Sequence, residues 1–290
     1  MPPGAVGDPE GIGAVRLLRG ILIAFEGIDG AGKTTQAKLL ARRLVDAGLS
    51  VVETKEPTGG PHGQRLRASA TSRRLKPEEE LETFIEDRKH HVAEVIQPAL
   101  TAGHVVIVDR YYFSTAAYQG ARGFDPDAII AVNEVFAPKP DLLVLLGIPV
   151  EEALRRIGAR ENGNGGGNAF EKRTTLQKCA AIFARLERPE LLRLDGVRSV
   201  SELHEEIVGA VDRGALFRAA CLKSYLEACE PEHCSFRINR QCDYPYLGSL
   251  RAAPPVSAEA LNAIVADPSL SAGEKLDRLA RILRGTPQQT

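Results

Sequence analysis

A glycine-rich segment with a lysine and two threonines is the first feature that could do chemistry. Residues 27–34 have the sequence Gly-Ile-Asp-Gly-Ala-Gly-Lys-Thr and match the pattern G-x-x-x-x-G-K-[ST]. In this pattern backbone N–H groups surround phosphate oxygens, Lys33 reaches the β- and γ-phosphates, and the Thr34 hydroxyl can ligate Mg²⁺. The segment therefore predicts nucleotide binding; an ordinary glycine-rich turn is the structural alternative. The residues expected at the phosphates are Gly27, Asp29, Gly30, Ala31, Gly32, Lys33, Thr34 and Thr35.

An Asp-Arg pair follows the apolar run 104–109. Because Asp109 ends this run, its carboxylate is expected at the carboxyl edge of a parallel sheet, where ligands bind in open α/β folds. A carboxylate in that place can hold Mg²⁺ directly or through water. The planar guanidinium of Arg110 suits an acceptor phosphate, with a structural ion pair as the alternative.

Two further groups combine charge with helical spacing. Phe84 and Arg88 are four residues apart, so a helix places them on one face, where they could stack on a base and hydrogen-bond to it. A helical aromatic residue is otherwise most often part of the core. Arg156 and Arg160 have the same spacing and precede the Gly/Asn tract 162–168, as expected of a closing lid with catalytic arginines. A solvated basic helix face is the alternative.

Alternating strands and helices must position these groups. The phosphate-binding segment lies between an apolar run at 21–25 and a helical pattern that Gly48 ends. A long helix is expected from Pro77 to about Leu100, and a capping box at Ser199 and Glu202 predicts a helix to about Val211. Each expected strand is apolar on both faces. Such strands alternating with helices predict an α/β fold with a five-stranded parallel sheet that helices cover on both faces. The expected strands are 21–25, 49–53, 104–109, 142–146 and 191–194, and 56–63 is expected to be a loop.

Composition limits the classes of function. The 290 residues hold 37 Lys+Arg and 38 Asp+Glu, and this near-neutral balance argues against binding to nucleic acid or to an acidic membrane. No apolar run approaches the ~20 residues that span a bilayer, and no secretory signal is evident, so we expect a cytoplasmic protein. The expected organisation is a mobile tail at 1–19, a catalytic domain at 20–215 and a small Cys-containing extension at 216–290.

Four segments in order resemble the thymidylate kinase family across about residues 20–215. They are Phe25–Gln36, Glu56-Pro57, Phe84–Arg88 and Asp109–Gly120. The resemblance implies a P-loop kinase fold, a homodimer, and transfer of the ATP γ-phosphoryl group to dTMP with Mg²⁺. Alternatives are a kinase for another nucleoside monophosphate or a nucleoside, and a nucleotide-binding regulatory or scaffold protein.

The resemblance also implies roles for residues that match the family's motifs. Arg110 would hold the dTMP phosphate, and Phe84 and Arg88 would hold the thymine. Tyr118 would pack where a ribose 2′-hydroxyl would lie, which favours deoxyribose. Near the acceptor the family also implies Asp29, Glu56, Pro57, Arg67, Thr115 and Gln119. In the family a catalytic arginine comes either from the phosphate-binding loop or from the lid. Since the loop here holds no arginine, the resemblance implies that the lid supplies it, with Arg156 or Arg160 as the candidates ahead of Arg155.

Several residues depart from the family pattern or fall outside it. Asn168 replaces a common lid acid, Gly147 replaces an aspartate, and residues 56–60 are EPTGG where EPGGT is more common. In the extension, Cys221, Cys229, Cys234 and Cys242 could hold zinc or an iron–sulfur centre, although free buried thiols are favoured because the spacing lacks a C-x2-C pair. His90 and His91 are expected in helix packing and capping rather than at a metal.

Overall fold

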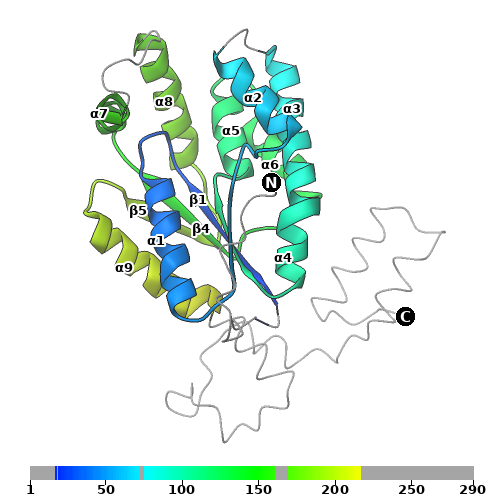
Figure 1. Ribbon diagram of the computed structural model, residues 1–290. Coiled ribbons are helices and arrows are strands. Elements are labelled where there is room, and N and C mark those ends of the chain that lie inside the picture. Colours follow the sequence, from blue (N-terminus) through cyan, green and yellow to red (C-terminus); the bar gives the residue numbers. More distant parts are fainter. Residues whose placement is uncertain (1–16, 18, 72–74, 161–168, 217–290) are drawn as a thin grey trace, which may run out of the picture. The chain divides into compact units, whose positions relative to one another are not determined.

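The computed structural model describes residue 17 and residues 19–71, 75–160 and 169–216. Within them the strands form one five-stranded parallel sheet in the order β2-β3-β1-β4-β5, which confirms the expected sheet (Figure 1). The strands are β1 (Ile21–Glu26), β2 (Val51–Lys55), β3 (Val105–Asp109), β4 (Leu142–Gly147) and β5 (Leu191–Asp195).

Helices pack on both faces of the sheet. On one face lies α1 (Lys33–Asp46), which contacts α9 (Val200–Ala210). The opposite face carries α3 (Pro77–His91), α4 (Gln97–Thr101), α5 (Tyr112–Gly120) and α8 (Ala169–Ala184). The remaining helical segments are α2 (Pro61–Thr71), η1 (Val92–Ile96), α6 (Pro126–Glu134), α7 (Val150–Arg160) and η2 (Val211–Leu216).

The central strands are buried and the edge strands are not. All six residues of β1 are buried, whereas β2 and β5 are partly exposed, so the expectation that every strand is apolar on both faces was wrong at the edges. An edge strand has a neighbour on one side only, and polar residues such as Glu53 and Arg193 are tolerated there. β2 also begins two residues later than expected, at Val51.

The long helix expected from residue 77 to about 100 is confirmed as a continuous run of α3, η1 and α4. Its backbone widens into a π-helix over Val92–Ile96, immediately before Pro98. Proline lacks an N–H and its ring clashes with the carbonyl four residues earlier, so the wider turn accommodates it. The capping box at Ser199 and Glu202 is present and begins α9.

The loop expected at 56–63 ends earlier, because α2 begins at Pro61. Proline is favoured in the first turn of a helix, where its missing N–H has no partner to lose. Two residues from the expected N-terminal tail have contacts with the domain: Leu17 N donates to Gly103 O at 2.8 Å, and Arg19 Nη2 lies 2.5 Å from Asp141 Oδ1.

The extension and its cysteines, Cys221 to Cys242, lie outside the described residues. In the described part of the chain no group of three or more His, Cys, Asp or Glu residues could hold a metal ion. In the same part, no helix combines the length and the apolar composition that a membrane crossing needs.

Candidate active site

The loop between β1 and α1 has the geometry of a phosphate-binding loop. Gly27 (φ 138°) and Gly32 (φ 99°) adopt backbone angles that other residues rarely reach. A side chain at Gly27 would also stand 2.4 Å from Leu146 O, so β4 comes too close for any other residue. Lys33 Nζ donates to Gly27 O and Ile28 O, each at 2.9 Å, which folds the lysine across the loop.

Burial makes the charge on Lys33 costly. The side chain is almost fully buried, and desolvation together with the nearby positive charge of Arg110 lowers its pKa to about 8. Asp29 and Asp109 oppose this shift. A polyphosphate in the loop would supply the missing negative charge, so the site is electrostatically prepared for an anion.

Thr34 and Asp109 meet at the carboxyl end of β3, as predicted. The Thr34 hydroxyl donates to Asp109 Oδ2, and Asp109 Oδ1 is buried with no partner among the described residues. A hydroxyl and a carboxylate with a free oxygen are ligands that Mg²⁺ prefers beside phosphates. The pair therefore fits a magnesium ion.

Replacing Asp109 by asparagine tests this fit. Asparagine keeps an oxygen for the Thr34 hydroxyl but removes the negative charge, so we expect activity to fall about 10–100-fold at low Mg²⁺ and to recover partly at high Mg²⁺. Activity measured against free Mg²⁺ checks this, with thermal unfolding as the control for the fold. A variant with the wild-type Mg²⁺ dependence would contradict the assignment.

Arg110 is held in an unusual conformation at the start of the loop after β3. Its φ is 72°, and its N–H donates to Phe25 O at 3.0 Å. Its guanidinium donates to Asp29 Oδ1 at 2.5 Å and Ser114 Oγ at 3.1 Å, and lies 5.4 Å from the Tyr118 ring centre. A strained backbone kept at one residue is typical of a functional position.

Glu26 is a supporting residue that sequence reasoning missed. Its carboxylate is fully buried and accepts from Tyr111 N at 2.8 Å, Ser114 N at 2.9 Å and Ser114 Oγ at 2.5 Å. Burial raises the pKa of this carboxyl, and the hydrogen bonds oppose that shift. Glu26 thereby fixes the start of α5 and the loop that carries Arg110. An acid at the end of an otherwise apolar run was the available signal.

A cavity of 230 Å³ brings together the residues expected at the acceptor. Arg88 and Thr115 lie within it in direct contact, since Arg88 Nη2 donates to Thr115 Oγ1 at 2.9 Å. Tyr118 Oη accepts from Asp29 N at 3.1 Å and so joins α5 to the phosphate-binding loop. The lining residues are Asp29, Glu56, Pro57, Glu80, Phe84, Arg88, Arg110, Tyr111, Ser114, Thr115, Tyr118 and Gln119.

Arg67 does not line this cavity, although the resemblance implied it near the acceptor phosphate. It is exposed on α2 and donates to Pro57 O at 2.9 Å and Thr58 O at 2.5 Å. Asp87, which is buried, holds the same loop by accepting from Thr58 N and Thr58 Oγ1, both at 2.7 Å. The threonine that departs from the more common EPGGT sequence thus has a role in fixing this loop.

The two histidines expected in helix packing have different surroundings. His91 is buried, with Nδ1 3.0 Å from Glu56 Oε1 and Nε2 2.7 Å from Thr54 Oγ1. His90 is exposed, and its ring centre lies 5.0 Å from that of His62. His91 thus supports Glu56, which in turn binds Arg88.

A second cavity, of 560 Å³, surrounds the phosphate-binding loop and includes Asp109, Arg110, Arg155, Arg156 and Arg198. Arg156 Nη1 is 3.4 Å from Gly30 O, and Arg156 Nη2 donates to Gly196 O at 3.0 Å. Within the described part of the chain, Arg155 instead has hydrogen bonds to Glu152 alone, and it is mostly exposed. The side chain of Arg160 lies outside the described residues.

The two cavities share Asp29 and Arg110 and therefore adjoin. A parallel sheet with this loop after its first strand, and a second cavity beside the loop, defines the class of P-loop nucleotide-binding proteins.

Comparisons with known proteins identify the family within this class. The family model for thymidylate kinase matches residues 25–207. A protein named thymidylate kinase from Desulfotalea psychrophila is 47% identical over 190 residues, which is 65% of this chain and 93% of that protein. One of the same name from Xanthomonas campestris is 51% identical over 170 residues, 59% of this chain and 73% of that protein. A crystal structure of thymidylate kinase from Ehrlichia chaffeensis is 26% identical, with a TM-score of 0.49, and covers 67% of this chain and 99% of its own. Because the family model matches more than half of its length, the chain belongs to the thymidylate kinase family.

Proposed function

We propose that the chain transfers the γ-phosphoryl group of ATP to dTMP and yields dTDP and ADP. The observation that carries this proposal is the pair of adjoining cavities, one around the phosphate-binding loop and one lined by an aromatic ring and a guanidinium. Because Asp29 and Arg110 line both, a phosphate bound in the 230 Å³ acceptor cavity faces a triphosphate bound in the 560 Å³ cavity around the loop.

The chemistry of the acceptor cavity supports a thymine base. Arg88 can only donate hydrogen bonds, so it suits a ring carbonyl and not an exocyclic amino group. Phe84 lines the same cavity and offers a stacking surface. Tyr118 is held by its bond to Asp29 N, and a fixed ring beside the sugar would exclude a 2′-hydroxyl.

The reaction then needs positioning more than covalent help. An oxygen of the dTMP phosphate forms a bond to the γ-phosphorus, and the bond from that phosphorus to the β–γ bridging oxygen breaks, so the electron pair leaves with ADP. The attacking group is already an anion and needs no general base. Lys33 and a lid arginine stabilise the charge on the transferring group, and Arg110 orients the acceptor. Mg²⁺ bound at Thr34 and Asp109 would neutralise phosphate charge.

An acceptor panel tests the proposal. ADP release would be measured with ATP, Mg²⁺ and each of dTMP, dUMP, dGMP, CMP, UMP and thymidine. We expect a dTMP-dependent rate far above the others. A flat background with all six, from folded protein that binds ATP, would contradict the proposal; a preference for another acceptor would retain the chemistry and change the substrate.

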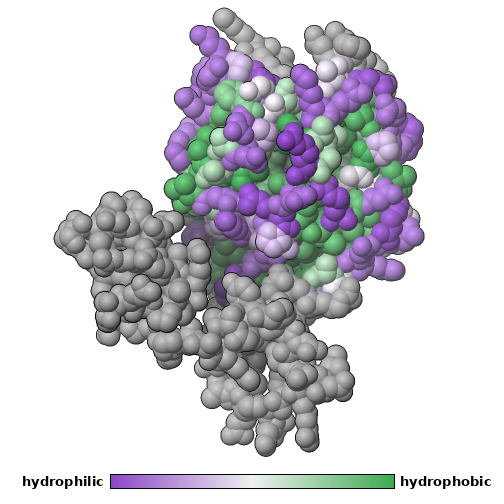
Figure 2. All heavy atoms as spheres, turned by 180° about the vertical axis from the view of Figure 1, so that it is seen from behind, coloured by the Kyte–Doolittle hydropathy of each residue, from purple (hydrophilic) through white to green (hydrophobic). Residues whose placement is uncertain are grey.

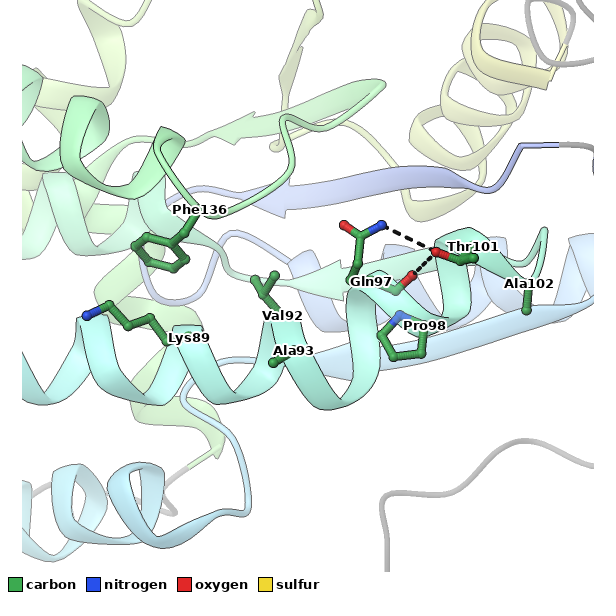
Figure 3. A pocket seen from close by; sticks show the side chains of 8 residues that line it. All are labelled: Lys89, Val92, Ala93, Gln97, Pro98, Thr101, Ala102 and Phe136. Atoms are coloured by element: carbon green, nitrogen blue, oxygen red, sulfur yellow. Dashed lines mark hydrogen bonds between the residues drawn. The ribbon is translucent and has the colours of Figure 1, made fainter. Parts of the chain in front are cut away.

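We also propose a homodimer, as the family resemblance implies. The support is an apolar groove of 720 Å³ along α3, η1 and α4, covered at one side by Phe136 (Figure 3). The segment just before Phe136 exposes two valines: Val132 is 52% exposed and Val135 is 86% exposed. Viewed from behind, the described part shows hydrophobic residues among hydrophilic ones at its surface (Figure 2). A contiguous apolar groove, unlike apolar residues scattered singly over a surface, is typical of an interaction site.

Light scattering on the full chain tests the dimer. We expect twice the 31.3 kDa mass of one chain for the wild type and the mass of one chain for Val135→Asp, because a buried charge has no partner at an apolar interface. Val197→Asp, at a position 51% exposed elsewhere, is the control and should leave the dimer intact. A monomeric wild type would refute the proposal.

The proposed organisation keeps the catalytic domain at 20–215 and the extension at 216–290, in a cytoplasmic protein. Normal turnover of dTMP by a chain that ends at residue 215 would show that the extension has no essential catalytic role. Zinc or iron bound to the four cysteines stays a proposal that metal analysis of the full chain would decide.

A further inference from the structure

Arg88 is a buried polar side chain of the acceptor cavity that several partners hold. It is 1% exposed, and one edge of its guanidinium is bound by Glu56 Oε2, which accepts from Nε at 2.9 Å and Nη2 at 2.5 Å. Nη2 also donates to Thr115 Oγ1, and the Tyr111 ring centre lies 5.6 Å from the guanidinium carbon. These contacts anchor the Nε and Nη2 edge and leave the Nη1 end to another partner.

That partner is Asn133, which does not line the cavity. It comes from α6, is 0% exposed, and accepts from Arg88 Nη1 through Oδ1 at 2.7 Å. Its amide nitrogen donates to Ile129 O at 2.8 Å. Since a guanidinium only donates and a carbonyl only accepts, these two bonds allow a single orientation of the amide.

A count of donors shows what this arrangement leaves over. A guanidinium carries five N–H groups. Glu56, Thr115 and Asn133 take four of them, and one hydrogen on Nη1 has no partner among the described residues. Because the guanidinium is planar and rigid, the bond from Nη1 to Asn133 fixes the tilt of the whole group, and with it the direction of the last N–H.

We propose that Asn133 is a positioning residue for base recognition, which acts by aiming the remaining Nη1 hydrogen of Arg88 at a carbonyl oxygen of the acceptor's base. This inference rests on the proposed function, and it adds a specificity-determining residue outside the cavity. Without Asn133 the guanidinium keeps its ion pair with Glu56, but the whole planar group can tilt about that ion pair, which carries its remaining N–H away from the base.

Binding of two acceptor probes separates this role from a structural one. The probes are dTMP and 2-deoxyribose 5-phosphate, which has the sugar and phosphate but no base. For Asn133→Ala we expect dTMP affinity to fall about tenfold and the affinity for the baseless probe to stay within about twofold. A structural role would weaken both equally, and that result, or unchanged dTMP affinity, would overturn the proposal.

Three further variants separate a positioning role of Asn133 from a loss of stability. Ile130→Ala removes a buried side chain from the same helix and should lower stability without changing the ratio of the two affinities. Asn133→Asp keeps an acceptor for Arg88 and should retain dTMP affinity within about threefold, even with lower stability. In an Arg88→Ala background, Asn133→Ala should change dTMP affinity no further; an additive loss would overturn the proposal. A wild-type chain that binds the baseless probe but gains nothing from thymine would instead refute the proposed function.

Discussion

Substituting Arg156 by alanine is expected to lower kcat about 10³-fold and to change KM for dTMP only a little. An arginine that contacts the transferring phosphoryl group stabilises charge that is greatest in the transition state, so its removal lowers kcat rather than ground-state binding. Arg156 already lies beside Gly30 in the phosphate-binding loop. Glu152 orients it, and hydrogen bonds from Arg155 and Arg156 lower the pKa of Glu152 to about 2, which keeps that carboxylate charged.

The neighbouring arginines provide the comparison. Arg155→Ala removes the same charge from the same turn of α7, but this guanidinium binds Glu152 and not the loop, so we expect a change within about threefold. Single-turnover kinetics with saturating ATP and dTMP measure the chemical step for each variant. A 10³-fold loss in Arg160→Ala with an active Arg156→Ala would assign the role to the other lid arginine and contradict our assignment.

Replacing Arg110 by glycine is expected to raise KM for dTMP about 100-fold, which corresponds to about 2.7 kcal/mol. A two-pronged donor to a phosphate is among the strongest polar contacts in proteins. Glycine is the informative substitution because φ at this position is 72°, so glycine removes the guanidinium and relieves the backbone at once.

Two further variants test the role of the Arg110 guanidinium. Arg110→Lys keeps the charge without the planar fork, so we expect it to recover only part of the affinity. Ser114→Ala removes one partner of the guanidinium and should raise KM for dTMP a few-fold at most. Steady-state kinetics with varied dTMP concentration measure KM and kcat for each variant. An unchanged KM with a large loss of kcat would place Arg110 at the transferring group and not at the acceptor phosphate.

The phosphate-binding loop and the sheet were predictable from the sequence because their signals are local. The motif at 27–34 fixes a loop between a strand and a helix, and continuous apolar runs mark strands that are buried on both sides. The β2 edge strand has a weaker pattern, and its start was misplaced by two residues because edge strands tolerate polar residues.

The supporting residues were not predictable, because their roles depend on contacts between distant segments. Asn133 contacts Arg88 across 45 positions of the chain, and Glu26 contacts Ser114 across 88. Nothing in the local sequence marks the role of Asn133, and the one local signal for Glu26 is an acid at the end of an apolar run. For Arg67 the resemblance implies a place near the acceptor phosphate, and the structure adds its donation to the carbonyls of Pro57 and Thr58, in the loop beside the acceptor cavity.

The most direct test of the central claim follows the γ-phosphoryl group itself. The full chain would be incubated with ATP labelled at the γ-phosphate, dTMP and Mg²⁺, and the labelled products would be separated. We predict that label enters dTDP, that omission of dTMP or chelation of Mg²⁺ prevents this, and that little label is released as inorganic phosphate. Label found only in inorganic phosphate, or none transferred by protein that binds both nucleotides, would contradict phosphoryl transfer to dTMP.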